Sequence, residues 1–169
     1  MSEREYGETG GRVLALIGAA AATLSLALTW ATEDQTVAVG AGDSQAYTRG
    51  GEQWSGWNLG GTSGLDSHRP VSLVTAVILI AATLGILALC WLGFEWSHRR
   101  WIPLVTAGVA LVLLVASLWL LGGIAGTFGA GHIVTVEEGL PVWRFSLCLV
   151  LLGAARVAVL EERRKAAVT

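Results

Sequence analysis

Long apolar segments alternate with short polar segments along the chain. The apolar segments cover 13–31, 71–94, 102–124 and 141–160, and the first three contain no charged residue. A helix rises about 1.5 Å per residue, so roughly 20 residues cross a hydrocarbon core of about 30 Å. The pattern therefore predicts one integral membrane domain with four transmembrane helices. Its expected parts are a cytoplasmic tail (1–11), helix 1 (12–32), an extracytoplasmic β-containing loop (33–69), helix 2 (70–94), a cytoplasmic loop (95–101), helix 3 (102–124), an extracytoplasmic Gly-rich loop (125–140), helix 4 (141–160) and a cytoplasmic tail (161–169).

The first apolar segment also has a second interpretation. Arg12 could be the basic flank of a signal peptide, with Ser25-Leu26-Ala27 as its cleavage site. We favour a membrane span, because the segment is longer than the ~7–15 residues of a signal core and Trp30 suits an interfacial anchor.

The polar loop between the first two apolar segments carries strand signals. Residues 35–39, 44–49 and 52–59 are separated by turn residues, and Gly50-Gly51 suits a two-residue hairpin turn. The second loop begins Gly-rich and leaves room for one short strand over 132–138. We therefore predict an all-α membrane fold: a four-transmembrane-helix bundle with a small antiparallel β-meander in the first extracytoplasmic loop.

Composition supports the membrane assignment and narrows the partners. Hydrophobic residues make up 53% of the chain and charged residues 14%, and the mean hydropathy is +0.60. These values are too apolar for an ordinary soluble domain. The net charge of -2 gives no electrostatic support for a nucleic-acid partner.

The basic residues predict the orientation in the plasma membrane. With a cytoplasmic N-terminus, eight of the 11 bases lie inside, so the positive-inside rule favours cytoplasmic N- and C-termini. Tryptophans at both expected boundaries agree with an aromatic belt, in which Trp30 and Trp143 mark the outer side. The inner bases are Arg4, Arg12, Arg99, Arg100, Arg156, Arg163, Arg164 and Lys165, and the outer ones are Arg49, Arg69 and Arg144.

No pattern in the sequence points to catalysis, a cofactor or a metal. The chain has no GxSxG, Walker-type or CxxC motif, and no carboxylate lies within an apolar segment. His68 and His132 are near carboxylates but lack a metal-ligand spacing. Cys90 and Cys148 are expected at different depths, so they are expected to be small packing residues without a disulfide.

Two sets of residues are candidates for contacts with partners or lipids. Exposed Trp is enriched at interfaces, although Trp54 and Trp57 could instead cover the helix ends. Arg144 could be functional or could snorkel to the interface. It could also pair with Glu137 or Glu138, or with Glu33 and Asp34 across the outer surface. The candidate partner or lipid contacts are Trp54, Trp57, Trp119, Trp143 and Arg144. The candidate anionic-lipid contacts, which also serve as topology signals, are Arg99, Arg100, Arg163, Arg164 and Lys165.

Small residues four positions apart recur in the apolar segments. Such pairs let helix backbones approach closely, so we expect them to pack within the bundle or against another subunit. They are Ala15/Ala19, Gly18/Ala22, Ala81/Gly85 and Gly122/Gly126.

With four spans, both ends inside and a strand-bearing first outer loop with Trp54 and Trp57, the chain resembles the claudin-like tetraspan arrangement in topology only. The claudin-type loop carries a Cys pair after its Trp, and this loop has none. Neither the disulfide nor a junction function is therefore implied. The composition and Leu28-Thr29-Trp30 also resemble small Trp-containing membrane proteins of actinobacteria, many of them uncharacterised.

The sequence thus favours a non-enzymatic accessory or assembly subunit of a bacterial envelope complex, docking to other integral membrane proteins through its outer loops and helix faces. The alternative is a lipid or small-amphiphile binding or transport protein with a groove between spans under those loops.

Overall fold

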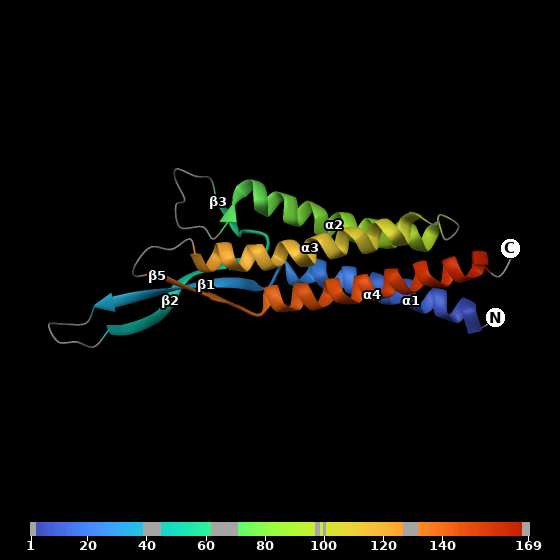
Figure 1. The fold of residues 1–169 in the computed structure, drawn as a ribbon. Helices are drawn as coiled ribbons and strands as arrows, with labels where there is room; N and C mark the ends of the chain where they lie inside the picture. Colours follow the sequence, from blue (N-terminus) through green and yellow to red (C-terminus); the bar gives the residue numbers. More distant parts are fainter. Residues whose placement is uncertain are drawn as a thin grey trace.

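In the computed structural model, four long helices lie side by side and a small sheet lies at one end of them (Figure 1). The structure describes residues 3–38, 45–61, 71–96, 99, 101–126 and 132–166. Both termini lie at the end opposite the sheet (Figure 1). The helices are α1 (Glu3–Ser25), α2 (Leu73–Glu95), α3 (Trp101–Gly126) and α4 (Gly139–Ala166). The strands are β1 (Thr29–Ala38), β2 (Gln45–Ser55), β3 (Gly60–Gly61), β4 (Val71–Ser72) and β5 (His132–Val136).

Three helices are long and apolar enough to cross a membrane. Within the described residues they are α2 over its full length, α3 over Trp101–Trp119 and α4 over Gly139–Arg163. Their outward faces expose large apolar side chains, which water disfavours and lipid accepts. The chain is therefore built as a helical membrane protein.

The structure does not support a fourth span over 12–32. α1 ends at Ser25 and the chain enters β1 at Thr29. Only 13–25 of this helix is apolar, which is about 20 Å of rise against a hydrocarbon core of about 30 Å. The predicted tail 1–11 is also wrong in part, because α1 already begins at Glu3.

Glycines explain why α1 starts so early and lies against α4. A Cβ on Gly11 would lie 2.9 Å from the carbonyl oxygen of Gly153, and a Cβ on Gly18 would lie 2.7 Å from that of Ser146. The two backbones are therefore close together, as small residues permit in membrane helices. This packing outweighs the low helix propensity of glycine.

The predicted small-residue pairs behave in two ways. Ala15, Ala19 and Ala22 are buried, and Gly18 packs against α4, as packing within the bundle requires. Ala81 and Gly85 are exposed on α2 instead. The surroundings of the pair in α3, at 122 and 126, are outside what the structure describes.

The sheet is not a meander within one loop. Its strand order is β2-β1-β5, with both pairings antiparallel, so the second loop supplies the third strand. Gly50-Gly51 is not a hairpin turn, because both residues lie inside β2 at a register shift between Thr32 and Asp34 of β1. Extra residues on one strand at such a shift bend the strand and increase its twist.

A second, two-stranded pairing returns the chain to the bundle. β3 pairs in parallel with β4, directly before α2. Ser72 then caps α2, since its side chain accepts a hydrogen bond from the N–H of Thr75. Residue 70, where the sequence predicts that this helix begins, lies outside the described residues.

Candidate functional site

Three tryptophans form the core where the sheet meets the helices. Trp30 is 0% exposed, and Trp54 and Trp143 are each 1% exposed. The rings of Trp30 and Trp143 have centroids 5.4 Å apart and are tilted by 52°, a geometry that aromatic quadrupoles favour. Trp30 and Trp143 are therefore buried core residues, and their prediction as a lipid-facing aromatic belt is wrong.

Trp30 also ends α1. Its indole N–H donates to the carbonyl oxygen of Ser25 at 2.8 Å, which satisfies one of the acceptors that a helix leaves open at its C-terminus. Glycines from two other segments leave room for the ring. A Cβ on Gly56 would lie 2.9 Å from the indole, and one on Gly139 would lie 2.2 Å from it. The end of α1, the end of β2 and the start of α4 thus meet at one side chain.

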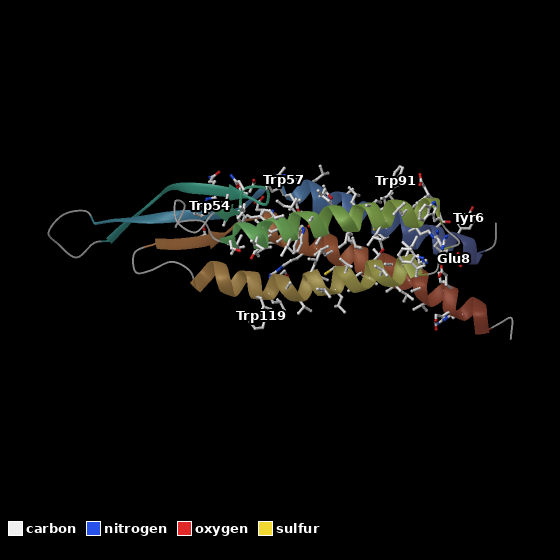
Figure 2. All side chains as sticks on the ribbon, turned by 90° about the horizontal axis from the view of Figure 1, so that it is seen from above. Tyr6, Glu8, Trp54, Trp57, Trp91 and Trp119 are labelled. Carbon is white, nitrogen blue, oxygen red and sulfur yellow. The ribbon has the colours of Figure 1, made fainter. Side chains whose placement is uncertain are left out.

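Trp57 is the exposed counterpart of Trp54. Its side chain is 48% exposed, and Figure 2 shows it on the outer surface near the end of α1. Its backbone N–H donates to the carbonyl oxygen of Leu26 at 3.3 Å, and Asn58 closes the turn by accepting from the N–H of Ser55. Trp54 is therefore buried and Trp57 is exposed, whereas the sequence left both possibilities open for each of them. The hydrogen-bonded turn holds the backbone of Trp57 in place.

Polar side chains join three helices beneath the sheet. The indole N–H of Trp143 donates to the hydroxyl of Thr83 on α2 at 3.1 Å. Next to it on α4, Arg144 donates from Nε to the hydroxyl of Ser117 on α3 at 2.9 Å, and from Nη2 to the Ser117 carbonyl oxygen. Within the described part of the chain, neither Glu137 nor any other carboxylate pairs with Arg144.

A hollow of about 100 Å³ lies beside this polar group, between α2, α3 and α4. Its walls are mostly apolar, with Leu79, Leu113 and Trp143 among the lining residues and Ser117 at one side. The hollow can therefore accept an apolar chain, while the neighbouring guanidinium can accept an anion.

The other predicted contact residues are scattered. Trp119 is 82% exposed and projects from α3 away from the other helices (Figure 2). Arg99 and Arg163 are exposed at the end of the bundle that carries the termini. The side chains of the remaining three, Arg100, Arg164 and Lys165, lie outside the described residues.

An ion pair that the sequence did not suggest joins three helices near the termini. Arg12 donates to the carbonyl oxygen of Gly93 on α2 at 2.6 Å and lies 3.5 Å from Glu161 on α4. The Arg12 and Glu161 side chains are only 13% and 12% exposed, so breaking this pair would leave a charge poorly hydrated.

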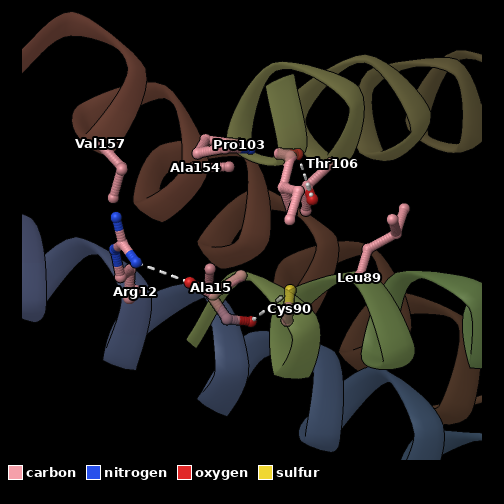
Figure 3. A pocket seen from close by; sticks show the side chains of 10 residues that line it. Arg12, Ala15, Leu89, Cys90, Pro103, Thr106, Ala154 and Val157 are labelled. Carbon is pink, nitrogen blue, oxygen red and sulfur yellow. Dashed lines mark hydrogen bonds between the residues drawn. The ribbon is translucent and has the colours of Figure 1, made fainter. Parts of the chain in front are cut away.

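Beside this ion pair is a second, smaller hollow of about 30 Å³ (Figure 3). Cys90 is buried there and its Sγ lies 3.6 Å from the carbonyl oxygen of Ala15. Cys148 is exposed on α4, and both thiols are free. Cys90 is therefore a packing residue between α1 and α2, whereas Cys148 is not.

No model of a known protein family matches the chain, and no curated protein matches it with significance. Sequence reasoning singled out Arg144 and the tryptophans, but it missed Ser117 and Thr83. The available signal was a hydroxyl residue in an otherwise apolar span, where it must find a hydrogen-bond partner.

Proposed function

We propose that this chain is a non-enzymatic accessory or assembly subunit of a membrane protein complex in the cell envelope, and that it docks through the sheet end of its helix bundle. The observation that carries the proposal is the projecting hairpin. β1 and β2 extend well beyond the ends of the helices (Figure 1). A hairpin that projects from its own core in this way gains little from it and is well placed to contact another chain.

The sheet also offers edges for pairing. In the strand order β2-β1-β5, the strands β2 and β5 each have one edge that pairs with no other strand in the described part of the chain. Such edges bind extended segments of other proteins by strand addition. Exposed Trp57 lies just after β2, where it can anchor such a contact.

The site is held firmly enough to serve as a platform. Trp54 at the end of β2 is buried, and Trp30 joins the same region to α1 and α4. Isolated hairpins are marginal in water, so this burial gives the sheet its order. In this proposal the sheet faces the extracytoplasmic side of the plasma membrane and both termini are cytoplasmic.

The docking role predicts a stable partner that depends on Trp57. Tagged protein extracted from native membranes in a mild detergent should recover one integral membrane partner, and tagged partner should recover this chain. Trp57→Ala should weaken the association about thirtyfold, which corresponds to the ~2 kcal/mol of a hot-spot aromatic.

Trp91→Ala is the matched control, because Trp91 is 58% exposed on α2 near the opposite end of the bundle (Figure 2). It should leave recovery unchanged. A monodisperse, partner-free protein from native membranes would rule out the docking role.

The hollow beneath the sheet supports a second role, the binding of a lipid or small amphiphile. It lies between three helices, is largely apolar and adjoins a cationic side chain. These are the features of a site for a molecule with an apolar chain and a polar head. The two roles are compatible, because the hollow and the strand edges are different surfaces.

A further inference from the structure

We infer that Arg144 binds the headgroup of an anionic phospholipid from the leaflet on the sheet side, with an acyl chain of that lipid entering the hollow between α2, α3 and α4. The inference rests on the second proposed role and names its ligand. Four features support it. They are the unused donors of Arg144, the lack of a counter-ion for it in the described part of the chain, the adjoining hollow, and the position of Arg144 along α4.

The hydrogen bonds of Arg144 leave part of the guanidinium available. Nε and Nη2 donate to Ser117, so the group is oriented by its Nε side. A guanidinium carries five N–H donors, and two of the remaining three lie on the edge between the two terminal nitrogens. That edge can bind a phosphate through two parallel hydrogen bonds.

No carboxylate in the described part of the chain neutralises the charge of Arg144. In the described part of the chain no carboxylate lies within ion-pair distance of it, and the residue is half-buried among helices. An arginine inside a membrane protein is costly unless it is paired or reaches the interface. A lipid phosphate supplies the missing negative charge without a second protein group.

The hollow places an acyl chain next to that charge. Ser117, which holds Arg144, also lines the hollow, and so does Trp143, its neighbour on α4. A headgroup on Arg144 and a chain beside Leu79 and Leu113 can therefore belong to one molecule.

The depth of the site also suits a phospholipid. Arg144 follows the first residue of α4, Gly139, by five positions, which is about 8 Å of helix rise. With the edge of the hydrocarbon core at the start of α4, the guanidinium would lie near the boundary between headgroups and acyl chains, within reach of a phosphate.

The test uses the whole protein in nanodiscs that contain either phosphatidylglycerol or phosphatidylcholine with the same acyl chains, and native mass spectrometry to count retained lipids. Wild type should retain phosphatidylglycerol about fivefold better, the factor that corresponds to ~1 kcal/mol for one basic residue near an anionic lipid. Arg144→Gln keeps a donor for Ser117 but removes the charge, so the preference should disappear.

Two matched variants show whether the charge at this position is responsible. Arg144→Lys should keep most of the preference, because it keeps the charge. Arg156→Gln should keep all of it, because Arg156 is an exposed arginine in the same helix near the opposite end of the bundle. A preference that survives in Arg144→Gln, or that is lost in Arg156→Gln, would overturn the inference.

Filling the hollow separates the headgroup proposal from the wider lipid-binding role. Ala116→Phe should reduce retention of both lipids, whereas Ala88→Phe, on the exposed face of α2 away from the hollow, should not. Equal retention of the two lipids by wild type, lost in Ala116→Phe, would overturn the anionic headgroup and leave the lipid-binding role intact. If no lipid of either kind is retained, both are wrong.

Discussion

Gly153→Leu is expected to separate α1 from α4 and to remove about 3 kcal/mol or more of stability, so that little folded protein accumulates. A Cβ at this position would lie 2.5 Å from the carbonyl oxygen of Gly11 and 2.6 Å from the backbone nitrogen of Ala15. Both are backbone atoms of a helix, which cannot move aside singly. The helices must therefore part, and the buried alanines between them lose their contacts.

Alanine substitutions provide the matched comparison for this prediction. Gly153→Ala should lower the unfolding temperature in detergent, followed by circular dichroism. Gly108→Ala should leave the unfolding temperature unchanged or raise it, because a Cβ at Gly108 meets nothing within 4 Å and alanine has the higher helix propensity, by up to ~1 kcal/mol. Equal unfolding temperatures for the two alanine variants would show that the α1–α4 contact is not as close as described.

Trp30→Ala is expected to lose about 3–5 kcal/mol, the usual result of truncating a fully buried tryptophan. The side chain is 0% exposed, packs on Trp143, and accounts for the hydrogen bond to the last residue of α1. Its removal takes away the group that joins the sheet to two helices. Besides lowering stability, it should make β1 and β2 accessible to protease while α2 and α3 remain intact.

Two variants serve as controls, one at the same position and one at an exposed tryptophan. Trp30→Phe keeps most of the apolar volume and should lose about 1 kcal/mol or somewhat more, since the carbonyl oxygen of Ser25 loses its donor. Trp57→Ala removes a half-exposed indole and should change stability by less than ~0.5 kcal/mol. A Trp30→Ala protein as stable as Trp57→Ala would contradict the assigned core.

Uninterrupted apolar runs made two helices predictable from the sequence. α2 and α3 each coincide with a long segment without charge, and in lipid a helix is the structure that satisfies the backbone hydrogen bonds of such a segment. α1 could not be predicted in the same way. Its end depends on Trp30 returning to Ser25, and its start depends on glycines packing against α4, which are tertiary contacts with no local signature.

The sheet and the site were predictable only in part. Strand periodicity indicated β structure in the first loop, but the pairing of β1 with β5 joins segments about 100 residues apart and cannot be inferred from a single sequence. Arg144 was recognisable as a charge in an apolar segment, whereas Ser117 became its partner only through the packing of α3 on α4.

The measurement that tests the docking claim most directly is photo-cross-linking in intact native cells. A photoreactive amino acid replaces Gln53, exposed in β2, and in a separate protein replaces Trp119, exposed on the outward face of α3. If the sheet end binds a partner, position 53 gives one discrete adduct with a second membrane protein and position 119 does not. Adducts at 119 alone, or none at 53, would contradict docking through the sheet.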